Sequence, residues 1–463
     1  MRRTLYLAIV AALGCTAPTE TTAQTTRVVV QSSGGETGSG TQWISGAPVR
    51  TQVQVGADGQ TYVGVWIDAP DSAPNVQVRP PMALSLVVDT SGSMSGAKIQ
   101  NARMAAASLL ETVADGDIVS LYAFSNGVVE IAPPTPVNQA TRASLMQRVQ
   151  YLHAGGGTNM YAGVTTGIQR IAQTTPSTHT VRRLVLISDG HANIGPADPM
   201  SLGNLAANGT EYGVQISAIG VGLDYDENTL GTLAVRSSGR LYHLEHPYQM
   251  AQILEREVNL LASTVATDAY IEIIPAPGVR ILEGVTQGAT LQNNRLRVPI
   301  GSVFAGQRRD VLFRAAVDTS SAGQRSLATA RFVYRPAGSN QGEQVQTTDV
   351  AYRVTRGAPP ANAVQPTVQA MVATVEAARA QRQAAEALNR GDRAAAERHF
   401  EFADAQIEGA LAAPVRAEER ERLQRTRTSN QRVRRRAAEA ATPAAARGAA
   451  LDSFDAAMEA EGY

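Results

Sequence analysis

Residues 82–96 read MALSLVVDTSGSMSG, and this stretch decides the fold of the chain. Its first seven residues, Met82–Val88, form an almost wholly apolar run without alternation, which is typical of a strand buried on both faces. Asp89 ends the run, small residues follow as far as Gly96, and the helical stretch Ala97–Val113 begins at once. A buried strand that leads through a tight loop into a helix predicts a parallel sheet covered by helices.

The same alternation of strands and helices continues after this stretch. Apolar runs predict further strands at 118–124, 183–188, 215–221 and 239–244. Between and after them we expect helices at 141–152, 161–173, 199–208, 227–235 and 248–262. We therefore predict an α/β domain over residues 82–265, built on a doubly wound, mostly parallel sheet with a Rossmann-like arrangement.

The segments on both sides of this domain have β patterns. Residues 24–81 and residues 266–356 contain short runs in which apolar and polar residues alternate. In the N-terminal segment, Ala57-Asp58-Gly59 separates two such runs, 52–55 and 61–67, and predicts a hairpin turn between them. We expect both segments to form β structure.

The C-terminal part of the chain is helical in pattern. A proline-rich linker, residues 357–366, leads into residues 367–463, which are rich in Ala, Arg and Glu. Gly391 is expected to end one helix and Asp392 to cap the next, so that three or four antiparallel helices result. The run Arg432–Arg436 is typical of a solvated helix face, with the binding of an acidic partner as the alternative.

Composition excludes several classes of protein. The chain has 463 residues, too many for one core, and 43% of them are hydrophobic, as in globular proteins. Its 41 basic and 41 acidic residues give a net charge of zero, which excludes a chain-wide electrostatic hold on nucleic acid or an anionic membrane. Lys98 is the only lysine, a bias that we attribute to GC-rich coding rather than function.

The first residues predict export. Arg2 and Arg3 precede the nine-residue apolar run Leu5–Leu13, as in a signal peptide covering residues 1–23. Cys15, the only cysteine, follows this run as the lipid-bearing cysteine of a bacterial lipobox does; cleavage after Ala23 is the alternative. We expect a protein of the periplasm or outer membrane, or one at the cell surface or secreted, with the membrane reached only through a lipid on Cys15.

Three loops carry the residues that point to chemistry. Asp89, Ser91 and Ser93 follow the first buried strand, Thr158 lies in a glycine-rich loop, and Asp189 ends another buried strand. In an open α/β sheet such loops meet at the carboxyl ends of the strands. Two carboxylates and three hydroxyls are oxygen ligands suited to Mg²⁺, with Mn²⁺ or Ca²⁺ as alternatives, and unsuited to Zn²⁺.

The sequence of these motifs resembles the metal-ion-dependent adhesion site of von Willebrand factor type A (VWA) domains, with all five family positions filled in order. The resemblance extends across residues 82–265, and is greatest to the bacterial and inter-α-inhibitor-type branch, in which β-sandwich segments flank the domain. It implies that the two β segments pack together with the VWA domain inserted between them. It also implies that the ion accepts an exposed Asp or Glu of a protein ligand.

The resemblance therefore favours a metal-dependent protein-binding module of the bacterial cell envelope. The alternative is a structural envelope scaffold that assembles through its β-sandwich and C-terminal helices, with the metal incidental. A metal-dependent hydrolase is a third reading, but no GxSxG elbow with suitable partners and no GxxxxGK[ST] motif occurs, so we expect no enzyme. His243 and His246 lie at a strand end and would not share a face as zinc ligands do. The oligomeric state and the ligand stay open.

Overall fold

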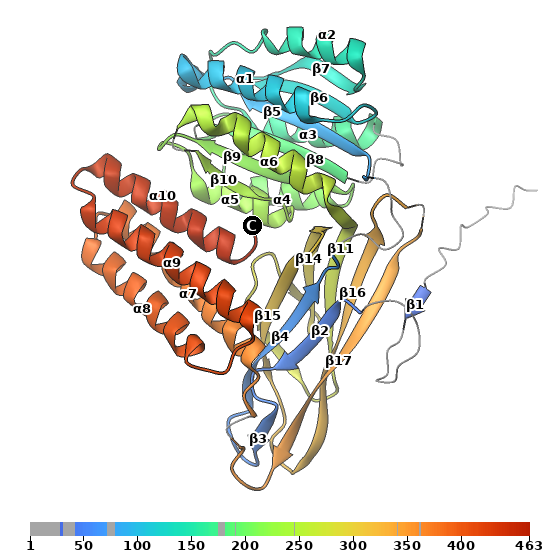
Figure 1. Cartoon of the computed structure of the whole chain (residues 1–463), viewed down its shortest axis with the longest axis vertical. Helices are drawn as coiled ribbons and strands as arrows, with labels where there is room; N and C mark the ends of the chain where they lie inside the picture. Colours follow the sequence, from blue (N-terminus) through green and yellow to red (C-terminus); the bar gives the residue numbers. More distant parts are fainter. Residues whose placement is uncertain are drawn as a thin grey trace, which may run out of the picture.

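The structure is a computed structural model, which describes residues 28–30, 42–71, 79–174, 181–189, 191–244, 246–339, 341–360 and 363–463. The expected signal segment 1–23, with Cys15, lies outside the described residues. Figure 1 shows three parts: an α/β domain at the top, a β-sandwich below it, and a group of C-terminal helices beside both.

The described part of the α/β domain contains six strands and six α-helices. Its strands are β5 (Met82–Asp89), β6 (Ile118–Phe124), β7 (Val128–Pro136), β8 (Val181–Ser188), β9 (Val214–Val221) and β10 (Leu241–Leu244). Its helices are α1 (Ala97–Thr112), α2 (Gln139–Val149), α3 (Met160–Thr174), α4 (Pro199–Thr210), α5 (Glu227–Arg236) and α6 (Met250–Ala262), with short 3₁₀ turns η1 (Gly92–Met94) and η2 (Pro247–Gln249).

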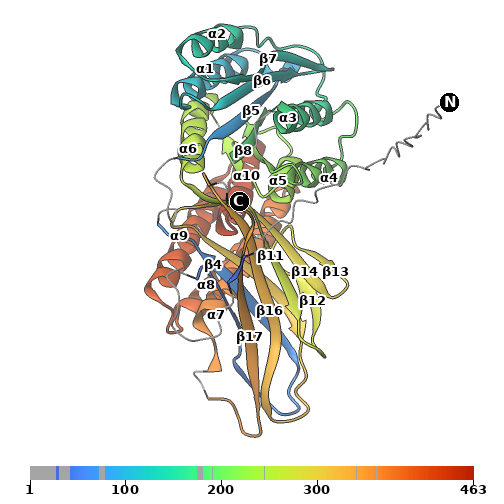
Figure 2. The same cartoon turned by 90° about the vertical axis from the view of Figure 1, so that its right-hand side faces the viewer.

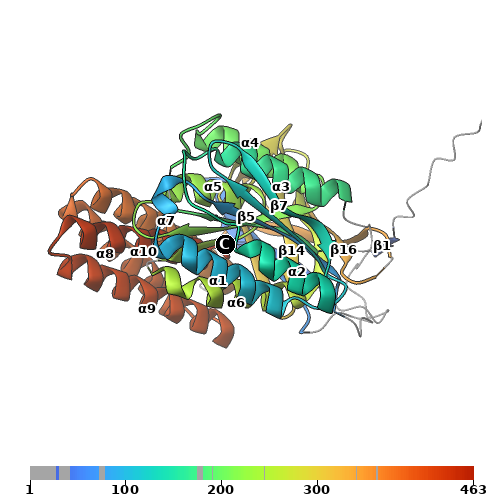
Figure 3. The same ribbon diagram turned by 90° about the horizontal axis from the view of Figure 1, so that it is seen from above.

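The sheet of this domain has the order β10-β9-β8-β5-β6-β7. The first five strands in this order run parallel and β7 is antiparallel to β6. Helices α1, α2 and α6 cover one face, and α3, α4 and α5 cover the other (Figure 3). All residues of β5, β6 and β9 are buried, because helices lie on both faces. The predicted doubly wound, mostly parallel α/β fold is confirmed.

Strand β7 was not predicted from the sequence. Its residues include Pro133, Pro134 and Pro136, which argue against a strand in the middle of a sheet. The structure resolves the conflict by placing β7 at the edge of the sheet, with Pro133 and Pro134 at a register shift between Ala132 and Thr135.

The β-sandwich is built from both flanking segments. The N-terminal segment supplies β1 (Val28–Val30), β2 (Ile44–Pro48), β3 (Gln52–Gln54) and β4 (Gln60–Asp68). The second segment supplies β11 (Thr264–Pro275), β12 (Arg280–Gly284), β13 (Thr290–Gln292), β14 (Arg295–Phe304), β15 (Arg308–Ala316), β16 (Gly323–Pro336) and β17 (Gln344–Thr355). One sheet has the order β1-β17-β16-β11-β14-β13 with β3 on β17, and the other β12-β15-β4-β2.

The two β segments therefore do pack together. Strand β4 pairs with β15 over nine residues, and the chain leaves the sandwich after β4 and returns to it at β11 (Figure 2). Because β11 begins at Thr264, directly after α6, the sandwich starts two residues before the expected boundary at 266.

The predicted hairpin at residues 57–59 is wrong. Strand β3 pairs with β17 and strand β4 pairs with β15 and β2, so the two runs lie in different sheets. Val53 and Val63 both point into the core between the sheets. Turn residues indicate that the chain reverses, but the partner of each strand depends on distant segments.

The C-terminal part forms four helices, α7 (Pro366–Asn389), α8 (Arg393–Leu411), α9 (Ala417–Glu439) and α10 (Pro443–Ala460). As expected, Gly391 adopts a positive φ of 77° after α7, and the side chain of Asp392 caps α8 by accepting from the amide of Ala395. Within the run 432–436, Arg434 pairs with Glu397, Glu401 and Asp404 of the neighbouring helix. This favours a structural role for the run.

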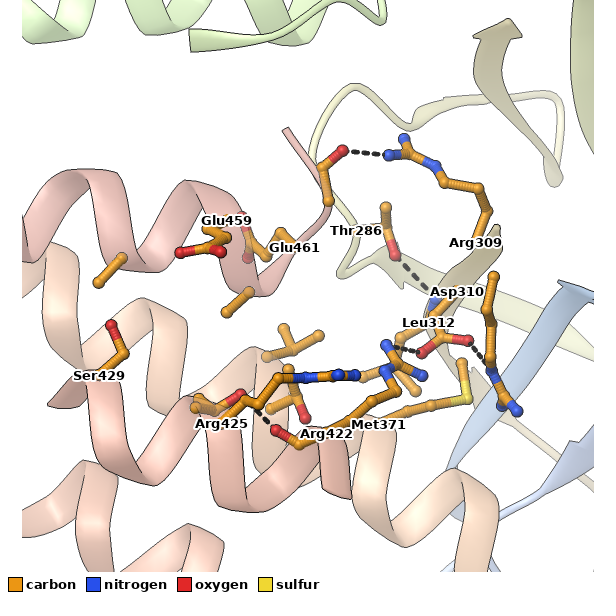
Figure 4. Close-up of a pocket in the computed structure, with 17 residues that line it drawn as sticks. Thr286, Arg309, Asp310, Leu312, Met371, Arg422, Arg425, Ser429, Glu459 and Glu461 are labelled. Carbon is orange, nitrogen blue, oxygen red and sulfur yellow. Dashed lines mark hydrogen bonds and ion pairs between the residues drawn. The ribbon is translucent and has the colours of Figure 1, made fainter. Parts of the chain in front are cut away.

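The helices join the sandwich around a cavity of about 260 Å³ (Figure 4). On its wall, the carboxylate of Asp310 accepts from Arg422 Nη2 of α9 at 2.8 Å and from Arg308 Nε of β15 at 2.9 Å. Arg309 donates to the carbonyl of Gly462 at the end of the chain. The charges that line this cavity therefore hold the helices against the sandwich.

None of the described helices is long and apolar enough to cross a membrane.

Candidate metal centre

The candidate site lies at the carboxyl edge of the α/β sheet. Strands β5 and β8 are parallel neighbours, and Val88 is opposite Ile187, so their ends bring Asp89 next to Ser188 and Asp189. Both aspartates are buried, with exposed fractions of 0% and 1%. The positions of the two aspartates are thus set by the ends of two paired strands.

A continuous series of hydrogen bonds joins four of the five predicted residues. Asp89 Oδ1 accepts from the amide of Ser91 at 2.8 Å, and Asp89 Oδ2 accepts from Ser188 Oγ at 2.6 Å. Ser91 Oγ and Ser93 Oγ are 3.0 Å apart, and Ser93 Oγ donates to Asp189 Oδ1 at 2.7 Å. The two carboxylates are therefore linked through Ser91 and Ser93.

The fifth residue, Thr158, belongs to a loop that is bound to the other two. The amide of Gly92 donates to the carbonyl of Gly156 at 3.0 Å, and the amide of Thr158 donates to Asn193 Oδ1 at 2.9 Å. Gly156 has a φ of +86°, which a residue with a Cβ rarely adopts. Thr158 is 3% exposed. Backbone contacts thus hold its loop against the loop after β5 and the loop after β8.

Burial dominates the electrostatics of Asp89. It raises the pKa of this carboxyl, which hydrogen bonds from Ser188 and Ser91 partly offset, and the nearby charge of Asp189 raises it further. Burying two carboxylates close together is costly unless positive charge compensates them. A cation at this edge would lower that cost.

A basic residue that the sequence analysis did not assign to the site is already present. Lys98, in the first turn of α1, forms an ion pair with Asp189 Oδ2. The only signal of this pair in the sequence is that Lys98 is the sole lysine of the chain.

The residues around the site have simpler roles. Asp226 caps α5 by accepting from the amides of Asn228 and Thr229. His191 is exposed, with Nδ1 3.8 Å from Asp226 Oδ2. Met94 is fully buried and belongs to the hydrophobic core.

A second unpredicted residue, Arg447 of α10, holds the loop between β9 and α5. Its Nε donates to the carbonyl of Leu223 at 3.1 Å, and its Nη2 to that of Tyr225 at 2.8 Å. Its Nη1 and Nη2 also donate to the two carboxylate oxygens of Glu227 at 2.7 and 2.6 Å. With a further bond from Nη1 to Asn389 Oδ1 at 3.0 Å, all five N–H groups of the guanidinium are used.

The donor set fits a hard divalent cation. Carboxylate and hydroxyl oxygens are the ligands that Mg²⁺, Mn²⁺ and Ca²⁺ prefer, and water or a partner's oxygen can complete the shell. Across the described ranges, no group of three or more His, Cys, Asp or Glu side chains could hold a metal ion. A site at this edge would therefore depend on the hydroxyls as well as on the two aspartates.

Comparison with known proteins identifies the α/β domain. Residues 84–256 match the family model of the von Willebrand factor type A domain. An uncharacterized protein of Synechocystis sp. is 25% identical over 274 residues, which cover 57% of this chain and 64% of that protein. Inter-alpha-trypsin inhibitor heavy chain H3 of Mus musculus is 27% identical over 213 residues, which cover 43% of this chain and 23% of that protein. The chain thus spans less than two thirds of the length of these relatives.

Solved structures share the fold of nearly the whole chain. A von Willebrand factor type A protein from Catenulispora acidiphila superimposes with a TM-score of 0.71 at 16% identity, covering 91% of this chain and 98% of that one. The ArnB paralog VWA2 from Sulfolobus acidocaldarius gives a TM-score of 0.57 at 16% identity, covering 90% and 98%.

Proposed function

Residues 84–256 form a VWA domain, and from this premise we propose that the protein binds a divalent cation at the carboxyl edge of its sheet and uses it to bind a partner protein. VWA domains are commonly metal-dependent protein-interaction modules. The partner would contribute an exposed Asp or Glu to the ion. Mg²⁺ is the proposed ion, with Mn²⁺ and Ca²⁺ as alternatives.

The observation that carries the proposal is the junction of the two aspartates through two serines. Ser93 Oγ is 2.7 Å from Asp189 Oδ1 and 3.0 Å from Ser91 Oγ, and Asp89 Oδ1 is 2.8 Å from the amide of Ser91. These groups come from two strand ends about a hundred residues apart in sequence, and they place two buried carboxylates at one edge of the sheet.

Each of these side chains has a distinct task in the proposal. Asp89 and Asp189 would neutralise the cation, while the hydroxyls of Ser91, Ser93 and Thr158 would shape its coordination shell. The bound cation would supply an electrophilic centre with an open position for a carboxylate oxygen.

We further propose that the protein acts outside the cytoplasm, in the bacterial cell envelope or at its surface. The signal-like residues 1–23 support this, and a lipid on Cys15 would tether the chain to a membrane. In this proposal the protein binds a ligand and catalyses no reaction.

A pull-down from envelope extract tests the proposed function. Tagged wild type and Asp89→Ala are compared, each with Mg²⁺ and with EDTA, after circular dichroism has shown that both are folded. We expect a partner that only the wild type with Mg²⁺ retains. Equal recovery in all four lanes would contradict the proposal and would assign recognition to the sandwich or the C-terminal helices.

A further inference from the structure

We propose that Lys98 is a built-in competitor for the divalent cation: its ammonium group and the metal compete for Asp189, so that Lys98 sets the metal affinity of the VWA domain. This inference rests on the proposed metal centre and concerns its regulation.

The geometry at Asp189 is the first support. Its side chain is completely buried, and both of its oxygens are engaged, Oδ1 by Ser93 Oγ at 2.7 Å and Oδ2 by Lys98 Nζ. The side chain of Lys98 is 24% exposed, whereas that of Asp189 is fully buried, so the lysine lies between the carboxylate and the surface. A cation that binds Asp189, directly or through water, must share it with this ammonium or displace it.

The position of Lys98 in its helix is the second support. It is the second residue of α1, where the partial positive charge of the helix N-terminus disfavours a cation. The first turn of α1 contains no acidic residue that could compensate it. The stability of the helix therefore does not explain a lysine at this position. The ion pair with Asp189, which follows strand β8, does.

The residue type is the third support. The other basic residues of this chain are arginines, and Lys98 is one of 41. A guanidinium would hold a carboxylate through two parallel hydrogen bonds in a rigid plane. An ammonium is a compact point charge on a flexible stem, and it can retreat from the carboxylate when a stronger cation arrives.

Two consequences follow for the energetics. While the ammonium pairs with Asp189, it compensates one of the two buried carboxylates and stabilises the fold without metal. Once a divalent cation binds, the same ammonium repels it at short range. Removal of the Lys98 charge should therefore raise the metal affinity of the protein and lower its stability in EDTA.

Calorimetry on the full-length protein tests this inference. Wild type, Lys98→Met and Lys98→Arg are titrated with MgCl₂ and MnCl₂, and each is melted in EDTA and in Mg²⁺. We expect Lys98→Met, which keeps the length of the side chain, to bind both ions about tenfold or more tightly. We expect Lys98→Arg to bind them more weakly than wild type, because the guanidinium holds Asp189 with two bonds.

The controls separate this inference from its premise. Arg390→Met removes a positive charge from an exposed site far along the chain, and it should leave metal affinity unchanged. Lys98→Gln replaces Lys98→Met if the latter fails to fold. If wild type binds the ions and Asp89→Ala does not, the metal centre stands. If Lys98→Met then binds them no more tightly than wild type, only the proposed role of Lys98 is overturned. Failure of wild type and both lysine variants to bind either ion would overturn the metal centre as well.

Discussion

Two clusters of charge at the same end of the VWA domain are built in opposite ways. At the candidate metal centre, two buried carboxylates accept from different serine hydroxyls, and a single ammonium, that of Lys98, pairs with Asp189. At the attachment of α10, a short distance along the β9–α5 loop, one guanidinium faces one carboxylate, and all five of its N–H groups find acceptors.

The difference distinguishes a cluster that holds structure from one that can take a ligand. The charges of Arg447 and Glu227 balance, and every N–H group of Arg447 has an acceptor, so an added ion would gain little there. Asp89 and Asp189 carry more negative charge than the single ammonium of Lys98 neutralises, so an added cation would be favoured. Charge balance, rather than the number of charged residues, separates the two.

The largest effect is expected from Arg447→Ala. The substitution leaves Glu227 largely buried without its cation, and the loss of one partner of a buried pair costs about 3 kcal/mol. Urea denaturation would measure this loss, and limited proteolysis should show earlier release of α10. Retention of wild-type stability would show that the five hydrogen bonds contribute little, and it would contradict the structural role given to this cluster.

The next largest effect is expected from Asp89→Asn. This change keeps the shape of the side chain and removes one of the two charges, so Mg²⁺ affinity should fall about 100-fold, equivalent to about 2.7 kcal/mol. Isothermal titration calorimetry would measure it. Since an amide is easier to bury than a carboxylate, the melting temperature in EDTA should not fall. A variant that binds Mg²⁺ as wild type does would remove Asp89 from the metal centre.

A smaller, pH-dependent effect is expected at Asp455 of α10. Burial, helped by the charges of Glu459 and Asp452 and opposed by that of Arg432, raises the pKa of this carboxyl to about 7. The folded state therefore binds a proton that the unfolded state releases at about pH 4, and stability falls as the pH rises from about 4 to about 7.

Asp455→Asn should remove this slope and stabilise the protein at pH 8 by about 1–2 kcal/mol, a value reduced for screening by nearby water. Thermal melting between pH 4 and pH 8 would measure it. An unchanged slope in the Asn variant would assign the pH dependence to another group.

The smallest effect is expected from Arg434→Ala, the matched control for Arg447→Ala. Arg434 also faces several acceptors, in Glu397, Glu401 and Asp404, but Glu397 and Glu401 are largely exposed. Pairs in water are worth less, so the loss should stay below about 1 kcal/mol in the same urea experiment. If Arg434→Ala lowered the free energy of unfolding as much as Arg447→Ala, burial of Glu227 would not explain the stability of the Arg447–Glu227 ion pair.

Local patterns were sufficient for much of this fold. The unalternating run Met82–Val88 predicted the central strand, since only burial on both faces explains such a composition. The same kind of pattern predicted the other strands and the helices of the α/β domain. It did not predict β7, because three prolines in this edge strand are atypical of a strand. It also failed for the partners of β3 and β4, because a turn reports only that the chain reverses.

The sequence by itself determined the fold class and the candidate ligands, because burial and strand ends leave local, repeating or closely spaced patterns. The structure alone decided which charges meet. Lys98 reaches Asp189 across 91 residues, and Arg447 reaches Glu227 across 220. A single long side chain leaves no periodic signal, and its partner depends on how whole domains pack against one another. The balance of charge that we propose to govern metal binding is therefore a property of the tertiary structure.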